Sequence, residues 1–141
     1  MSRVYWDSMM FIYLQEGHPQ FAPLVQLAYE AMEKRNDTLC TSVFTVGEVL
    51  ILPRRKKNNV LADSIRSFML GSNIELLPFT LSTSEIYSDV RAATALKAAD
   101  AIHLATAIEC RARLFVTNDH QLQRIAMPGA PLIAGLDAKV W

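Results

Sequence analysis

Four acidic side chains are the residues of this chain whose type best suits shared chemistry. They are Asp7, Glu48, Asp100 and Asp119. Carboxylate oxygens are hard ligands of the kind that Mg²⁺ and Mn²⁺ prefer. Two such ions about 3.5–4 Å apart can clamp a phosphodiester, activate a water molecule and stabilise the departing oxygen. If the fold gathers these acids, the sequence predicts metal-dependent phosphodiester hydrolysis, with one or two metal ions on the same ligands.

Each acid also has a simpler structural interpretation. Asp7 and Asp119 each follow an apolar, strand-prone run and could cap the helix that comes next. Glu48 lies three residues after Thr45 and could complete a capping box with it. Asp100 stands in a strongly apolar run, where an unpaired carboxylate is costly unless a helix N-terminus or a metal stabilises it. Four acids at one place would repel one another, and divalent cations remove that conflict.

Strand-prone runs alternate with segments of helical periodicity along the chain. The expected strands cover residues 4–6, 39–41, 74–77, 114–116 and 132–133. The expected helices cover residues 9–14, 19–34, 42–53, 60–70, 82–96, 98–110 and 121–126. This alternation predicts an α/β fold of βαβ units with right-handed crossovers and a mostly parallel sheet. Ligands of such sheets bind beyond the carboxyl ends of the strands, so we expect the four acids to meet at one sheet edge.

Length and charge set limits on the class of protein. The chain has 141 residues, which suits one domain spanning residues 1–141. Its 14 basic and 14 acidic residues cancel, so it lacks the basic signature of a non-specific nucleic-acid binder. A neutral, apolar-rich chain tends to associate, which favours a partner or a homo-oligomer.

The N-terminal residues and the cysteines favour a cytoplasmic protein. The first residues are strand-like rather than typical of a signal peptide. Two cysteines, Cys40 and Cys110, allow a disulfide on count alone, but without a signal peptide they are expected to be buried thiols. No apolar run reaches the roughly 18 residues needed to cross a membrane, so no membrane association is expected.

Four motifs occur together in the order and spacing of one known family. They are Trp6-Asp7-Ser8, Thr45-Val46-Gly47-Glu48-Val49, Ala99-Asp100-Ala101-Ile102-His103-Leu104-Ala105-Thr106-Ala107 and Phe115-Val116-Thr117-Asn118-Asp119. The first two motifs are weak individually, the third is quite specific, and all four in order are a strong signal. The chain resembles PIN domains, and most of all the VapC-type toxins of bacterial toxin–antitoxin pairs. The resemblance runs from Val4 to about Ile133.

The resemblance implies a three-layer α/β/α fold with a mainly parallel central sheet. It implies endoribonuclease activity with Mg²⁺ or Mn²⁺, in which the four acids are both the catalytic and the metal-binding residues. It also implies that Thr117 orients Asp119 by a hydrogen bond. The polar residues expected to support the acids are Ser8, Thr117 and Asn118. Members of the family usually form homodimers, and a small antitoxin neutralises them by placing its C-terminal segment in the active-site groove.

One position departs from the family pattern. Met9 stands two residues after the first aspartate, where the family commonly has Asn or Ser. This departure motivates one alternative, a non-catalytic PIN module that binds RNA or a protein. Another alternative is a housekeeping RNA-processing nuclease. Metal-assisted cleavage would also suit DNA, because it does not require the 2′-OH.

Basic residues and one histidine complete the set of candidates. The candidates for RNA binding are Arg54, Arg55, Lys56, Lys57 and, more weakly, Arg91. The run of four is either a phosphate-contacting patch or a solvated helix end, where cations are favoured by the helix dipole. His103 lies one helical turn after Asp100 and is predicted to be a structural histidine. Nothing resembles a base-reading motif, so RNA shape and surface loops are expected to set the target.

Overall fold

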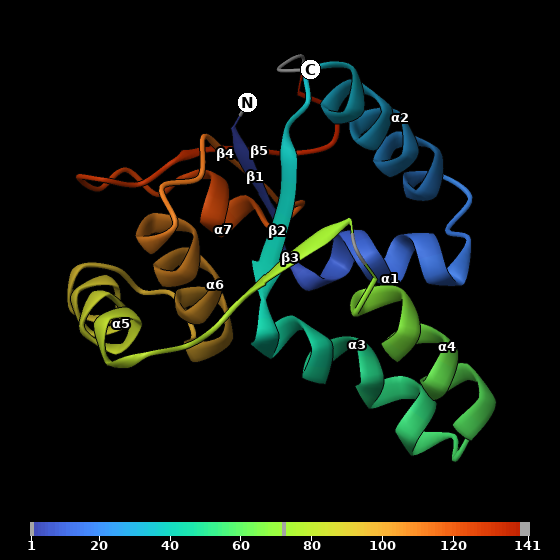
Figure 1. Cartoon of the computed structure of the whole chain (residues 1–141). Helices are drawn as coiled ribbons and strands as arrows, with labels where there is room; N and C mark the ends of the chain where they lie inside the picture. Colours follow the sequence, from blue (N-terminus) through green and yellow to red (C-terminus); the bar gives the residue numbers. More distant parts are fainter. Residues whose placement is uncertain (1, 72, 139–141) are drawn as a thin grey trace.

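A five-stranded sheet forms the centre of the computed structural model, which describes residues 2–71 and 73–138. Its strands are β1 (Arg3–Trp6), β2 (Thr38–Ser42), β3 (Ile74–Leu77), β4 (Leu114–Val116) and β5 (Leu132–Ala134). They lie in the order β3-β2-β1-β4-β5, and every neighbouring pair is parallel (Figure 1). The predicted α/β class with a parallel sheet is therefore confirmed, and each predicted strand has an observed counterpart.

The central strand, β1, is apolar on both sides. Val4 and Trp6 pack into an apolar cluster on one face of the sheet, whereas Tyr5 packs into a second cluster on the other face. All three side chains are almost completely buried. A strand of this kind needs a layer of helices on each face of the sheet, which gives the three-layer arrangement expected from the sequence.

Helices cover the two faces of the sheet (Figure 1). On the face of Trp6 the chain places α1 (Ser8–Glu16), α2 (Phe21–Lys34), α3 (Val43–Arg55) and α4 (Asn59–Met69). On the face of Tyr5 it places α5 (Leu81–Ala93), α6 (Ala98–Glu109) and α7 (His120–Gln123). In the described part of the chain, no helix is long and apolar enough to cross a membrane.

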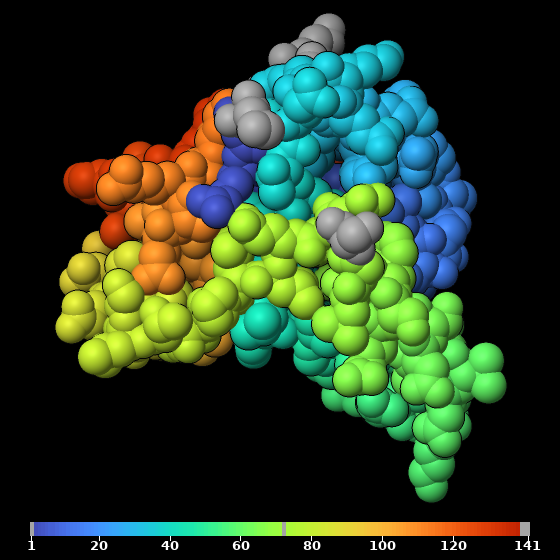
Figure 2. Space-filling model, in the orientation of Figure 1, coloured from blue at the N-terminus to red at the C-terminus, as the bar shows by residue number. Residues whose placement is uncertain are grey.

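Helices α3 and α4 project from the body of the molecule, at the lower right of Figure 2. The sequence predicts that α3 ends near Pro53, but α3 continues to Arg55, because the proline falls near the end of the helix and interrupts little of it. Asn58 caps α4 by accepting a hydrogen bond from the Leu61 N–H at 3.0 Å. Exposed apolar side chains on the two helices include Ile51, Leu52, Val60, Leu61 and Phe68.

Helices α5 and α7 are shorter than the sequence predicts. α5 ends at Ala93 instead of residue 96, because the next residue adopts an extended backbone. The hydroxyl of that residue, Thr94, donates to the Val90 carbonyl at 2.8 Å and accepts from the Leu96 N–H at 3.2 Å. α7 is a single turn that ends at Gln123 instead of residue 126. The early end of α5 leaves a short connection that leads directly into α6.

Candidate active site

Asp7 and Thr117 connect the carboxyl ends of the neighbouring strands β1 and β4. The Asp7 N–H donates to the Val116 carbonyl at 3.3 Å, and its carboxylate caps α1 by accepting from the Met9 N–H at 3.1 Å. The Thr117 hydroxyl donates to the second carboxylate oxygen of Asp7 and accepts from the Asp119 N–H at 3.1 Å. Thr117 thus holds the backbone of Asp119, and it also binds the Asp7 carboxylate, which the sequence did not indicate.

Asp119 begins α7 and caps it. Its Oδ1 accepts hydrogen bonds from the Gln121 N–H at 2.8 Å and from the Leu122 N–H at 3.4 Å. Because both bonds reach the same oxygen, Oδ2 is left available for another partner. Within the described residues, the side chain of Asn118 bonds to groups other than the acids: its Oδ1 accepts from the Leu136 N–H at 3.3 Å, and its Nδ2 donates to the Tyr13 hydroxyl at 3.5 Å. Asn118 thus holds the segment that follows β5.

Glu48 is held by two partners on one of its oxygens. It lies on α3, and its Oε1 accepts from the Ser8 hydroxyl and lies 2.6 Å from Nε2 of His103. Burial raises the pKa of Glu48, but the bonds with His103 and Ser8 outweigh burial and hold the pKa below its ordinary value. Glu48 is therefore an oriented anion whose Oε2 remains available. It makes no capping box with Thr45, because the N-cap of α3 is Ser42.

His103 links Glu48 to the central strand. Its side chain is almost completely buried, and Nδ1 lies 2.7 Å from the Tyr5 hydroxyl. The Tyr5 oxygen accepts from the Ser42 N–H at 3.2 Å, so its own proton can be donated to Nδ1. This places the ring proton on Nε2, from which it is donated to Glu48. The sequence offered one signal of this link, because an imidazole inside an apolar helix needs partners for both nitrogens.

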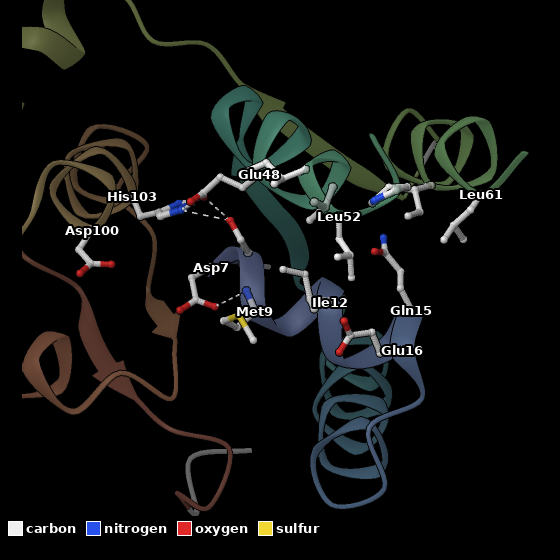
Figure 3. Close-up of a pocket in the computed structure, with 15 residues that line it drawn as sticks. Asp7, Met9, Ile12, Gln15, Glu16, Glu48, Leu52, Leu61, Asp100 and His103 are labelled. Carbon is white, nitrogen blue, oxygen red and sulfur yellow. Dashed lines mark hydrogen bonds and ion pairs between the residues drawn. The ribbon is translucent and has the colours of Figure 1, made fainter. Parts of the chain in front are cut away.

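Asp100 lies in the first turn of α6, at the same end of the pocket as Asp7 and His103 (Figure 3). The N-cap of α6 is Lys97, so Asp100 is not the capping residue, although the helix dipole favours an acid there. Burial raises the pKa of Asp100, and the negative charges of Asp119 and Glu48 raise it further. The acids of three separate helices therefore lie within one electrostatic environment.

The acids border a pocket of about 410 Å³ between α1, α3, α4 and α6. Asp7, Glu48, Asp100 and His103 lie at one end of it (Figure 3). Apolar side chains form much of the rest of the lining: Ile12, Ile51, Leu52, Leu61 and Ile65. The pocket thus combines a negatively charged end with a largely apolar groove, which Gln15 and Glu16 also line (Figure 3).

The donor set at the charged end suits a hard divalent cation. Burial raises the pKa of Asp7 to about 6, even though the bond from Thr117 and the backbone N–H groups of α1 act to lower it. A nearby cation would stabilise the ionised carboxylate, and oxygen donors fit Mg²⁺ or Mn²⁺. Among the described residues, no three acid, histidine or cysteine side chains are already close enough to hold a metal ion. Binding an ion between Asp7, Glu48, Asp100 and Asp119 therefore requires side-chain adjustment, for which Oε2 of Glu48 and Oδ2 of Asp119 are available.

Sequence comparison matches residues 4–127 of the chain to the PIN domain. The chain belongs to the PIN domain family. The resemblance inferred from the four motifs is thereby confirmed. No curated protein sequence matches the chain.

Several solved structures share the fold of this PIN domain. VapBC2 from Rickettsia felis, bound to a DNA fragment from its promoter, has a TM-score of 0.76 and 20% identity over 94% of this chain and 98% of that one. A toxin–antitoxin complex from Klebsiella pneumoniae has a TM-score of 0.70 and 20% identity over 94% and 97% of the two chains. VapC20 from Mycobacterium tuberculosis, a sarcin–ricin loop cleaving toxin, has a TM-score of 0.70 and 13% identity over 85% and 92%. At these identities the likeness establishes the shared fold alone.

The predicted RNA-binding cations of this PIN domain lie outside the pocket. The four consecutive cations are exposed where α3 meets α4, and none of them lines the pocket: Arg54, Arg55, Lys56 and Lys57. Arg91 lies on α5, where its guanidinium donates to the Tyr87 hydroxyl at 2.9 Å. The fold therefore brings the acids together without bringing these cations into the same cavity.

Replacing Asp7 with Asn should stabilise the metal-free PIN domain near neutral pH. The folded pKa of Asp7 is about 6, whereas an unfolded aspartate has a pKa of about 3.9. Asp7 therefore favours folding while it is protonated, and this contribution is lost as the pH rises through about 6. We expect Asp7→Asn to raise the free energy of unfolding by about 2–3 kcal/mol at about pH 7.5. The difference should shrink toward zero below about pH 4, where Asp7 is protonated in both states.

Urea unfolding across this pH range measures the effect. Asp89→Asn is the matched control, because Asp89 is an exposed acid on α5 that does not line the pocket. Added Mn²⁺ should raise the melting temperature of the wild type more than that of Asp7→Asn. An Asp7→Asn protein that is less stable than the wild type near neutral pH would contradict the prediction.

Proposed function

We propose that this PIN domain is a metal-dependent endoribonuclease that acts as the toxin of a type II toxin–antitoxin pair. The observation that supports this most strongly is the convergence of Asp7, Glu48, Asp100 and Asp119 at the carboxyl edge of a parallel sheet. Three of these acids border an open pocket, and the fourth raises the pKa of one of them. A cluster of this kind is difficult to explain by helix capping alone, because neither Glu48 nor Asp100 is a cap.

The four acids would hold Mg²⁺ or Mn²⁺ against an RNA phosphodiester. When bound, the cation supplies positive charge that offsets the charge of the phosphate and makes a water molecule easier to deprotonate. The chain's own residues supply orientation. Thr117 and the start of α1 fix Asp7, His103 and Ser8 fix Glu48, and the start of α7 fixes Asp119.

The apolar part of the pocket favours a protein partner as well as RNA. Ile12, Ile51, Leu52 and Leu61 offer a groove that leads to the acids. A short antitoxin segment with apolar side chains would fit this groove and block access to the acidic end. Two of the similar structures are a VapBC2 complex and a toxin–antitoxin complex, which supports an antitoxin partner for this chain.

One observation favours a second candidate, a non-catalytic PIN module that binds RNA or protein. Met9 is 41% exposed and lines the pocket beside Asp7. A thioether is a poor partner for a hard cation, in contrast to the Asn or Ser that is common in the family. This candidate requires that the biological effect survive the loss of individual acids.

Cleavage of a structured RNA pool with Mn²⁺ tests the nuclease. We expect the wild type and the control Asp89→Asn to cut RNA, and Asp100→Asn to cut at least about 100-fold more slowly, because loss of a ligand should exceed the usual cost of losing a supporting residue. The measurement is the rate of product formation on denaturing gels. Equal cleavage by the wild type and Asp100→Asn would exclude the carboxylate–metal mechanism. Absence of cleavage by the wild type would favour the binding module.

His103 should act as a positioning residue for Glu48. We expect His103→Leu to lower kcat and Mn²⁺ affinity by about 10–100-fold while leaving KM for RNA unchanged. His103→Gln keeps an N–H near the position of Nε2 and should recover most of the loss. A purely structural role predicts instead that both variants lose activity in proportion to their unfolded fraction, which circular dichroism measures independently.

Expression in a bacterial host separates a toxin from a housekeeping nuclease. A toxin should arrest growth when it is expressed alone, and Asp100→Asn should not. Co-expression of a small open reading frame found beside the gene should relieve the arrest. Normal growth with active wild-type enzyme would favour the RNA-processing role.

A further inference from the structure

Two thiols meet on the face of the sheet that α5 and α6 cover. Cys40 is buried in β2, and Cys110 is half-buried directly after α6. Both pack in the apolar cluster that contains Tyr5, and their side chains are within hydrogen-bonding reach of each other. The proposed nuclease uses neither thiol. Their proximity is therefore a feature of the fold that the acidic site does not explain.

The hydrogen bonds of the two thiols give them different roles. When both are protonated, Cys40 donates to the Val4 carbonyl at 3.6 Å and Cys110 donates to the Ala107 carbonyl at 3.4 Å. If Cys110 loses its proton, Cys40 can donate to the resulting thiolate instead. This bond lowers the pKa of Cys110, and the Ala112 N–H and the charge of Arg3 lower it further, against the effects of burial and of the Glu75 charge. The same bond, together with burial, raises the pKa of Cys40.

Cys110 is also the thiol that a small molecule can reach. It borders a surface hollow of about 440 Å³ whose lining includes three cations, Arg3, Arg111 and Arg113, and one acid, Glu75, which pairs with Arg3 at 2.6 Å. Nη1 of Arg3 donates to the Cys110 carbonyl at 3.2 Å, which holds a positive charge beside this residue. Reactive cysteines typically occupy such electropositive and partly exposed positions. Cys40, in contrast, has no exposed surface.

We propose that Cys40 and Cys110 form an oxidisable pair, in which Cys110 reacts with a peroxide and Cys40 resolves the product as a disulfide. The Cys110 thiolate attacks one oxygen of hydrogen peroxide, the O–O bond breaks, and the released hydroxide takes up the thiol proton as water. The Cys110 sulfenic acid is then attacked by the Cys40 sulfur. An S–S bond forms, the S–O bond breaks, and a second water leaves. In total, two thiols are oxidised while one peroxide is reduced to two waters.

The disulfide would connect β2 to the end of α6. Four elements lie between β2 and α6 in the sequence: α3, α4, β3 and α5. The disulfide would therefore close a long loop of the chain. Closing a long loop restricts the unfolded chain, and the oxidised protein should therefore melt at a higher temperature than the reduced protein. Cys110 lies beside the amino end of β1, where Arg3 binds its carbonyl, whereas Asp100 lies at the other end of α6.

Peroxide treatment tests whether the disulfide forms: the folded, full-length chain is treated with hydrogen peroxide at neutral pH and then alkylated under denaturing conditions. We expect the mass of the intact protein to decrease by the mass of two hydrogen atoms, and we expect neither cysteine to be alkylated. Peptide mapping should show one linkage, between Cys40 and Cys110, in a yield that does not depend on protein concentration. A reducing agent should restore both thiols and the original melting temperature.

Single variants test the order of the two steps. In Cys40→Ala, the Cys110 sulfenic acid should persist and react with dimedone, whereas in Cys110→Ala, Cys40 should remain a free thiol. Cys40→Ser is a second variant for the buried site, and circular dichroism confirms which variants are folded. The proposal is overturned if peroxide leaves both thiols free in the folded wild type. It is also overturned if only disulfides between chains form.

Discussion

The Asp7 carboxylate stands at the carboxyl end of the central strand, where it is almost wholly removed from water. Burying a charge is costly unless hydrogen bonds and opposite charges compensate for it. The surrounding structure supplies the hydrogen bonds, from Thr117 and from the first turn of α1. They compensate only in part, because the pKa of Asp7 remains raised. The site is therefore built around a negative charge that the protein alone does not fully stabilise, and strongly perturbed pKa values of this kind cluster at functional sites.

Helix starts supply part of this stabilisation. Asp7 precedes α1, Asp100 lies in the first turn of α6, and Asp119 precedes α7. The partial positive charge of a helix N-terminus favours an acid at each of these places. Capping and metal binding are thus not exclusive interpretations of Asp7 and Asp119. Each cap fixes the direction of a carboxylate, and in Asp119 it does so through one oxygen only.

The sequence was sufficient to predict the fold and the approximate meeting of the acids. Each strand is a short apolar run, and in a parallel sheet all carboxyl ends meet at one edge, so residues 7 and 119 had to approach each other once β1 and β4 were neighbours. Helix ends were less predictable, because side-chain bonds such as those of Thr94 decide where α5 stops. The hydrogen-bond partners of the acids also could not be predicted from the sequence. The bond from Thr117 to Asp7 joins residues 110 positions apart, and no local pattern encodes it.

The Tyr5–His103–Glu48 contact is a second long-range interaction that local sequence patterns do not predict. Each residue has an ordinary local interpretation: a strand aromatic, a helix histidine and a helix acid. Their connection exists only because β1, α3 and α6 come together at one end of the sheet. The motif around Asp100 indicated that this helix mattered. It did not indicate that the histidine one turn later would orient an acid on a different helix.

The pairing of β1 with β4 also affects when the site can form during synthesis of the chain. β1 is synthesised well before β4, the strand that lies beside it with the register Val4 to Leu114 and Trp6 to Val116. Asp7 and Glu48 therefore exist in the nascent chain long before Thr117 and Asp119 can join them. The acidic centre is assembled only after synthesis has passed Asp119. A stalled or truncated chain that ends before this strand carries three of the four acids but lacks Thr117 and Asp119, so its site is incomplete.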